Sequence, residues 1–165
     1  MSEMITDVQS VFSSIASKYD KLNTILTLNI DKIWRKKAVK LCTIKENDRV
    51  LDLCCGTGKM VELECTAVGE NTEVVGLDFN KEMLDVGYKN LNKSLTNYKF
   101  SLMQGDAMEL PFEDSTFNCI TIAFGLRNIP NKRKSISEMY RVLKPGGKVV
   151  CLELSKPEIP IFRKD

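Results

Sequence analysis

One stretch of the chain decides the fold: Val50-Leu51-Asp52-Leu53-Cys54-Cys55-Gly56-Thr57-Gly58. Apolar residues lead through an acid into a turn that two glycines flank, and an amphipathic run follows. This pattern predicts a buried strand, a tight loop and the start of a helix. Glycine lets the backbone approach a ligand closely, and free N–H groups at a helix start can bind a carboxylate or a phosphate. The stretch therefore predicts a nucleotide site, with an ordinary strand-to-helix connection as the alternative.

The spacing of the glycines argues against two common phosphate-binding motifs. A dinucleotide-binding loop would need a third glycine at the position of Val61. A P-loop would need serine or threonine after Gly58-Lys59, where this chain has Met60. Both phosphate-binding interpretations are therefore weakened.

The composition is that of an ordinary globular domain, with 43% apolar and 28% charged residues. We therefore expect one domain over residues 1–165. A net charge of +2 is too small to indicate a nucleic-acid or membrane partner by charge alone. The six cysteines lack C-x-x-C spacing and the chain has no histidine, so we expect no metal site and a reducing, cytoplasmic compartment.

Hydrophobic patterns predict an alternation of helices and strands. Five apolar runs are predicted strands, at residues 49–53, 73–78, 99–103, 117–124 and 148–154. Helix-spaced apolar residues predict helices at residues 8–22, 31–41, 80–92 and 131–143. Strands that are separated by helices pair in parallel through right-handed crossovers, so the predicted class is α/β with a mainly parallel sheet.

Two of these helices have a predicted inward face. In the helix at 31–41 the inward residues would be Ile33, Trp34, Ala38 and Leu41. In the helix at 131–143 they would be Ile136, Met139, Tyr140 and Leu143. We interpret the lysines on the outer side of the first of these helices as a solvated face.

Charged side chains follow several of the predicted strands. Asp78 ends the second strand, 20 residues after Gly58, and Asp106 and Arg127 follow the third and fourth strands. An acid at such a strand end can accept hydrogen bonds from both ribose hydroxyls of a nucleoside. The alternative for Asp78 is that it caps the following helix, a role for which Asn80 competes. Because the carboxyl ends of parallel strands share one edge, we expect these residues to meet the glycine loop there.

With these residues identified, the chain resembles the Class I S-adenosylmethionine-dependent methyltransferases. Residues 52–58 are similar to their acid-x-Gly-x-Gly-x-Gly motif, with Cys54 where many members have the first glycine. The similarity is greater to the UbiE/MenG family of quinone-biosynthesis C-methyltransferases. Its blocks here are Val11-Phe12, Ala16-Ser17-Lys18-Tyr19-Asp20, Trp34, Leu110-Pro111-Phe112, Phe124-Gly125-Leu126-Arg127-Asn128, Met139-Tyr140-Arg141-Val142-Leu143-Lys144-Pro145-Gly146-Gly147 and Leu152-Glu153-Leu154-Ser155-Lys156-Pro157.

The resemblance implies a Rossmann-like three-layer sandwich with strand order 3-2-1-4-5 and S-adenosyl-L-methionine as the cofactor. It implies that Thr57 holds the methionine end of the cofactor and that Asp78 holds the ribose. Asp106 and the backbone N–H of Ala107 would border the adenine. The family usually has serine at the position of Ala123, so one hydrogen bond of about 1 kcal/mol is missing here. The remaining expected cofactor-binding residues are Asp52, Gly56, Gly58 and Phe79.

The family reaction transfers a methyl group to a ring carbon of a demethylated prenyl quinol in menaquinone or ubiquinone biosynthesis. The carbon becomes nucleophilic when the neighbouring ring hydroxyl loses its proton, so the site must stabilise a phenolate and accept a proton. Because the chain has no histidine, we expect Arg127 to stabilise the anion and Tyr19 or Asp20 to take up the proton. The alternative is that Arg127 closes a turn and that Tyr19 and Asp20 cap the N-terminal helices.

The resemblance also divides the chain. N-terminal helices at 1–44 are expected to form part of the substrate mouth, and residues 45–155 are expected to form the cofactor-binding core. Family members continue beyond the Ser155-Lys156-Pro157 block into further helices and antiparallel strands, which this chain lacks. If the chain is complete, its fifth strand is an exposed sheet edge, and we expect a homodimer or poor solubility.

The lipid-tailed quinol implies peripheral contact with the inner membrane surface, whereas we expect no nucleic-acid partner. Two alternatives to this enzyme remain open. The first is a cofactor-binding module without turnover, and the second is a methyltransferase for another small acceptor.

Overall fold

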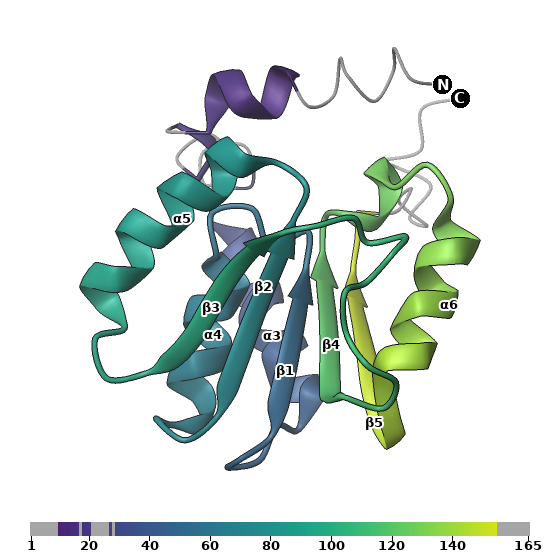
Figure 1. Cartoon of the computed structure of the whole chain (residues 1–165). Helices are drawn as coiled ribbons and strands as arrows, with labels where there is room; N and C mark the ends of the chain where they lie inside the picture. The colour runs from purple at the N-terminus through teal and green to yellow at the C-terminus, as the bar shows by residue number, and fades with distance from the viewer. Residues whose placement is uncertain (1–9, 17, 21–26, 28, 155–165) are drawn as a thin grey trace, which may run out of the picture.

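A single parallel sheet forms the centre of the fold. The computed structural model describes residues 10–16, 18–20, 27 and 29–154. Five strands run parallel in the order β3-β2-β1-β4-β5 (Figure 1). The strands are β1 (Arg49–Leu53), β2 (Glu73–Asp78), β3 (Lys99–Gln104), β4 (Phe117–Ala123) and β5 (Leu143–Leu152). The predicted α/β class and strand order are therefore confirmed.

Helices cover both faces of this sheet. They are α3 (Ile30–Cys42), α4 (Lys59–Val68), α5 (Lys81–Ser94), α6 (Lys132–Val142) and the 3-10 helix η1 (Leu126–Asn128). In Figure 1, α3 and α4 lie behind the sheet and α6 lies at its right. The three layers explain why the central strands read as continuous apolar runs, because such strands are buried on both faces.

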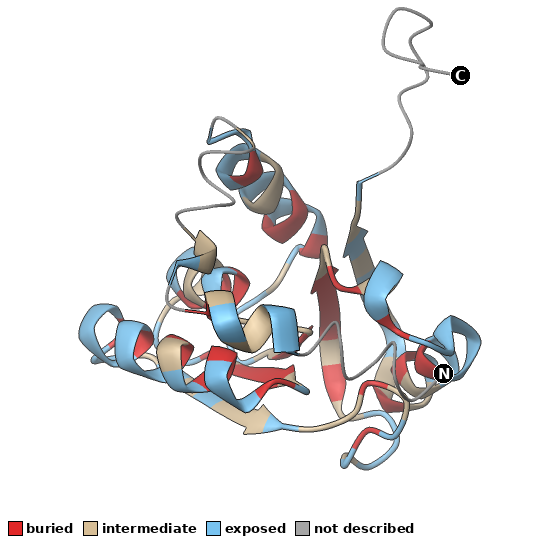
Figure 2. Ribbon diagram, turned by 90° about the horizontal axis from the view of Figure 1, so that it is seen from above, coloured by how far each residue is buried: buried red, intermediate tan, exposed pale blue. Residues whose placement is uncertain are grey.

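Alternate residues of β1 pack against the helices on opposite faces of the sheet. Leu51 and Leu53 pack in a core cluster with Met139 and Val142 of α6. Val50 points to the other face and packs in a cluster with residues of α3, α4 and α5. Figure 2, seen from above, shows buried segments in the middle strands and on the inward sides of the helices. Apolar cores therefore lie on both faces of the sheet, and a third, smaller cluster joins α3 to α4.

The start of β5 differs from the prediction. The fifth strand was predicted at residues 148–154, but β5 begins at Leu143, directly after α6 ends at Val142. The segment Lys144-Pro145-Gly146-Gly147 lies inside β5, next to a register shift opposite β4 between Phe117 and Cys119. The irregular pairing lets β5 include a proline and two glycines, because a bulged ladder does not need every N–H group.

The predicted inward faces of two helices were partly wrong. Ile33 and Leu41 of α3 are 66% and 57% exposed, and the buried residues are Asp31, Ala38, Val39 and Cys42. In α6, Ile136 and Tyr140 are 52% and 82% exposed, whereas Ser135, Met139 and Val142 are buried. In both helices a face that includes small residues contacts the sheet, and some of the larger apolar residues point away from it.

The N-terminal helix predicted at 8–22 lies partly outside the described residues.

Strand β5 forms one edge of the sheet. It pairs with β4 alone within the part of the chain that the structure describes. Val149 of β5 is exposed. Association of two copies through this strand stays a prediction.

Gly76 provides a test of how tightly β2 is packed. An ideal Cβ atom at this position would lie 2.6 Å from Leu102 Cδ2 and 2.9 Å from Cys55 Sγ. We expect Gly76→Val to lower the free energy of unfolding by about 1–3 kcal/mol, because the core has no room for the side chain. Urea unfolding measures this change.

The matched control is Ser101→Val, which adds the same branched side chain at an exposed position of the neighbouring strand. It should change the free energy of unfolding by less than about 0.5 kcal/mol. Equal effects of the two substitutions would contradict the tight packing around Gly76.

Candidate functional site

A cavity of about 710 Å³ opens at the carboxyl ends of the strands. This is the edge at which the strand order reverses between β1 and β4, where open α/β sheets bind their ligands. The volume lies in the range of small-molecule sites. Eight of the residues predicted from the sequence line it: Tyr19, Gly56, Asp78, Phe79, Asp106, Ala107, Ala123 and Arg127. The other four, Asp20, Asp52, Thr57 and Gly58, are absent from its lining.

The glycine loop presents its backbone to this cavity. Gly56 has φ of 55° and its N–H donates a hydrogen bond of 2.7 Å to Asp78 Oδ2. Cys54 also has a positive φ, of 55°. This left-handed conformation favours glycine, which explains why the family motif has glycine at the position of Cys54. Burial raises the pKa of the Cys54 thiol, which therefore stays protonated.

Asp78 is fixed by backbone amides. In addition to Gly56, the N–H of Asn80 donates a 2.8 Å hydrogen bond to Asp78 Oδ1. Burial raises the pKa of Asp78, and the backbone hydrogen bonds oppose this shift. A carboxylate offers about four acceptor sites, so the amides of Gly56, Asn80 and Phe79 leave capacity for a further donor.

The cap of α5 is Asn80, not Asp78. The side chain of Asn80 accepts a 2.9 Å hydrogen bond from the N–H of Met83. Asn80 therefore takes the capping role, and ribose binding by Asp78 stays a prediction. Its carboxylate lies in the cavity wall and joins the end of β2 to the glycine loop.

Asp106 and Phe79 form another side of the cavity. Asp106 Oδ1 accepts a 2.7 Å hydrogen bond from the N–H of Met108, which fixes the turn after β3. Phe79 is half exposed, and its carbonyl oxygen accepts a hydrogen bond from Gln104 Nε2. An aromatic ring beside a carboxylate suits a planar base that carries an amino group.

Arg141 of α6 holds the segment that follows Asp106. Its guanidinium donates to the carbonyl oxygens of Leu110 and Phe112 and to the carboxylates of Asp114 and Glu138. The hydrogen bond from Arg141 lowers the pKa of Glu138 to about 2, so this pair stays charged through the physiological range. The connection between β3 and β4 is thereby tied to a helix rather than left free at the rim of the cavity.

Thr57 and Asp20 lie together beside the glycine loop. The Thr57 hydroxyl donates a 2.6 Å hydrogen bond to Asp20 Oδ1, and Lys59 Nζ lies 4.0 Å from Asp20 Oδ2. The sequence predicted both residues for the site without relating them to each other. The structure brings them into contact and leaves Tyr19 lining the cavity.

Arg127 lines the cavity but already has an anionic partner. Its Nη1 atom lies 2.8 Å from Glu153 Oε1, and its N–H donates a 3.2 Å hydrogen bond to Glu153 Oε2. Arg127 also belongs to η1, the turn after β4, as the alternative interpretation expected. The ion pair reduces the positive charge that the guanidinium offers to a substrate.

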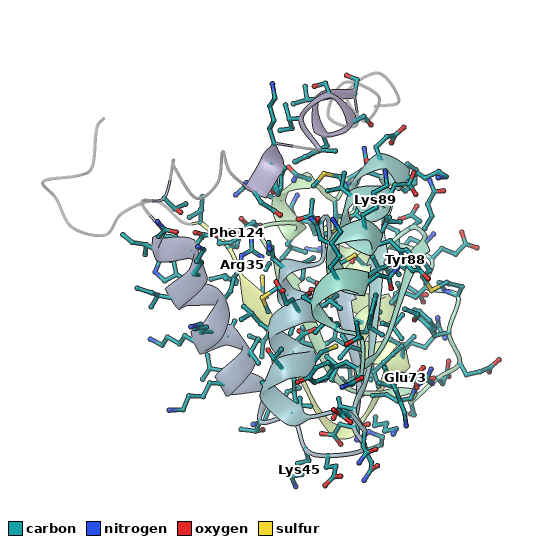
Figure 3. The ribbon with its side chains drawn as sticks, turned by 90° about the vertical axis from the view of Figure 1, so that its left-hand side faces the viewer. Arg35, Lys45, Glu73, Tyr88, Lys89 and Phe124 are labelled. Carbon is teal, nitrogen blue, oxygen red and sulfur yellow. The ribbon has the colours of Figure 1, made fainter. Side chains whose placement is uncertain are left out.

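Sequence reasoning missed several residues of this region. Phe12, Met83 and Lys132 line the cavity, and Glu153 pairs with Arg127. Arg35 of α3 lies against Phe124, whose ring lines the cavity; the guanidinium carbon is 4.9 Å from the ring centre (Figure 3). Arg35 and Glu153 stood within the family blocks or beside them, but a single sequence does not indicate which residue each would contact.

Comparison with known proteins agrees with this geometry. The profile of the ubiE/COQ5 methyltransferase family matches residues 1–165. The chain belongs to the ubiE/COQ5 methyltransferase family. It is 48% identical over 157 residues to a demethylmenaquinone methyltransferase of Staphylococcus aureus strain JH9, and the match covers 95% of this chain. The chain spans 64% of the length of that relative.

Solved structures share the same fold. A SAM-dependent methyltransferase from Aquifex aeolicus superposes with a TM-score of 0.69 at 26% identity, covering 76% of this chain and 66% of that one. The YcgJ protein of Bacillus subtilis superposes with a TM-score of 0.70 at 26% identity, covering 79% of this chain and 54% of the other. The fold seen here is therefore that of SAM-dependent methyltransferases.

Proposed function

We propose that this chain binds S-adenosyl-L-methionine in the 710 Å³ cavity and transfers its methyl group to a ring carbon of a demethylated prenyl quinol. The observation that carries the proposal is the Asp78 carboxylate, fixed by backbone amides at the end of β2 and facing the cavity. Family membership and the similarity to a demethylmenaquinone methyltransferase support the cofactor and the acceptor class.

The residues of the cavity fit such a cofactor. Asp78 retains acceptor capacity for a ribose hydroxyl, and Gly56 leaves space beside it. Phe79 and the Asp106–Ala107 turn can enclose the adenine, with the Asp106 carboxylate accepting from its amino group. When bound, the cofactor supplies an electrophilic methyl group. The chain holds it near the acceptor, and such positioning is a large part of catalysis in a displacement of this kind.

The acceptor side of the cavity is formed by other residues. Tyr19 lines it and can relay the proton of the ring hydroxyl by accepting it while giving up its own, and the carboxylate of Asp20, next to it in the chain, can take up the released proton. Arg127 and Lys132 are the cations in the described lining that can stabilise the phenolate. Phe12 and Tyr19 line the cavity, which supports a role of these residues in the proposed substrate mouth.

A second candidate is a cofactor-binding module without turnover. The ion pair between Arg127 and Glu153 favours it, because the guanidinium is then less available to a substrate anion. The nucleoside half of the cavity does not depend on that pair. Cofactor binding and methyl transfer must therefore be measured separately.

Because the acceptor has a lipid tail, we also propose that the chain contacts a membrane surface. The side chains of α3 support this contact. No helix in the described ranges is both long and apolar enough to cross a bilayer. The outer face of α3 carries exposed Ile30, Ile33 and Leu41 between four exposed lysines. The one acid of this helix, Asp31, is buried and lies 3.6 Å from Arg35. Apolar side chains flanked by unopposed lysines are typical of helices that lie on an anionic membrane surface.

Replacing Asp78 tests the cofactor site. We expect Asp78→Ala to weaken binding of S-adenosylmethionine at least about tenfold, because one hydrogen-bonded carboxylate contributes about 1.4 kcal/mol or more. Isothermal titration calorimetry measures the dissociation constant. Asp85→Ala, at an exposed position of α5, is the control and should leave it unchanged. An unchanged affinity of Asp78→Ala would remove this residue from the site.

Methyl transfer tests the proposed reaction. The chain is incubated with methyl-labelled cofactor and a demethylated prenyl quinol, and we expect the label to appear on the quinol ring. Glycine and phosphatidylethanolamine serve as acceptors of other classes. Tight cofactor binding with no labelled product from any acceptor would support the binding module instead.

Charge reversal on α3 tests the membrane contact. We expect the combined variant Lys36→Glu, Lys37→Glu and Lys40→Glu to bind phosphatidylglycerol vesicles about a hundredfold more weakly than the unmodified chain, at about 1 kcal/mol per lysine. Vesicle sedimentation measures the partition. The control reverses Lys89, Lys93 and Lys99, three exposed lysines of another surface. Equal losses in both variants would contradict a specific role of α3.

A further inference from the structure

A buried polar cluster lies beneath the glycine loop. The Thr121 Oγ1 atom is 2.9 Å from Asp52 Oδ1 and 2.7 Å from Glu64 Oε1. The three residues come from β4, β1 and α4, and they are 1%, 1% and 0% exposed. The remaining oxygens, Asp52 Oδ2 and Glu64 Oε2, are buried with no hydrogen-bond partner among the described residues.

The hydrogen bonds of this cluster require a proton on one carboxyl group. A hydroxyl carries a single hydrogen, so Thr121 can donate to one of its two neighbours only. The other short contact is favourable when that neighbour is a carboxylic acid that donates to Thr121 Oγ1. Two ionised carboxylates at this depth would leave one facing a hydroxyl lone pair, at a high desolvation cost.

Asp52 and Glu64 share this proton. Burial raises the pKa of Glu64. Burial, followed by the charge of Glu64, raises the pKa of Asp52 as well. Because both carboxyl groups are buried beside the same hydroxyl, the pair holds one proton.

The cluster supports the part of the chain that faces the cofactor. Asp52 lies in β1 two residues before Cys54, at which the backbone turns to a positive φ. The N–H of Gly56 then reaches Asp78. Fixing the Asp52 side chain from below therefore fixes the direction in which β1 leaves the sheet.

We propose that Glu64 is a positioning residue: it shares one proton with Asp52 through the Thr121 hydroxyl, and loss of this proton weakens cofactor binding. The part of this inference that concerns binding rests on the proposed function. The part that concerns the proton rests on the hydrogen-bond geometry alone.

Other titratable groups surround the pair. They are Arg35 and Cys42 of α3, Cys65 of α4, Asp78 of β2, Cys119 of β4, and Cys55 of the glycine loop. Burial contributes to raising the pKa of Cys55, Cys65 and Cys119, so these thiols stay neutral. A hydrogen bond with Cys119 lowers the pKa of Cys42, which makes Cys42→Ala a necessary control.

The first experiment measures cofactor affinity against pH. For the unmodified chain we expect the dissociation constant of S-adenosylmethionine to rise about fivefold or more between about pH 6 and about pH 9. Glu64→Gln keeps the size and the donor of the protonated acid without its titration, and its constant should change less than about twofold. Glu62→Gln, on the outer side of the same helix, and Cys42→Ala should follow the unmodified chain. A Glu64→Gln variant that also follows it would overturn the proposal.

The second experiment needs no ligand. The pKa of Glu64 is raised in the folded state, so the folded chain binds more protons than the unfolded chain between about pH 4.5 and about pH 8. Stability must then fall as the pH rises through this range, and Glu64→Gln should make that fall smaller. The midpoint of thermal unfolding measures it. Parallel curves for the two chains would overturn the shared proton.

The two experiments separate the two proposals. If no form of the chain binds S-adenosylmethionine at any pH, the proposed function fails. The unfolding curves then still decide whether Asp52 and Glu64 share a proton.

Discussion

The hydrogen bond from the Gly56 N–H to Asp78 Oδ2 is the contact on which the rest of the site depends. It joins the turn after β1 to the end of β2, and it can form only when the two strands are parallel neighbours in the observed register, with Leu53 opposite Leu77. Burial makes the Asp78 carboxylate costly, so it needs these amides as much as they need an acceptor. The register of two strands is therefore linked to the chemistry of one side chain.

A parallel sheet brings the other polar groups to the same place. Asp78 ends β2, Asp106 follows β3, and Arg127 follows β4, so side chains distant in the sequence line one cavity. The amino ends of α4 and α5 also lie at this edge, because each helix begins just after the strand that precedes it. Their free N–H groups favour negative charge there. The fold thus offsets part of the cost of gathering acids at one edge.

The sequence was sufficient to predict where the strands lie and which acids follow them. Apolar runs identify buried strands without knowledge of their partners, and Asp78 was found from its position alone. Periodicity failed on α3, because the face that meets the sheet is set by close packing of Ala38 and Cys42, not by the largest apolar side chains. The partner of Arg127 could not be foreseen either, since Glu153 reaches it only after β5 has aligned beside β4.

Glu64 shows most clearly that burial of a charged residue cannot be deduced from its position in the sequence. It lies on α4 among residues of mixed polarity, and this pattern predicts that an acid belongs to a solvated face. It is buried because Thr121, 57 residues further along the chain, is placed under α4 by β4.

The physical meaning of Glu64 appears only when the hydrogens are counted. Asp52, Glu64 and Asp78 supply three carboxyl groups at or below the glycine loop, but desolvation raises the pKa of each. One proton shared through Thr121 lets its hydroxyl bond to both carboxyl groups, so the loop rests on one buried negative charge instead of on two that repel each other. The Asp78 carboxylate can then keep its own charge next to the cavity, where its hydrogen bonds to the backbone compensate for burial.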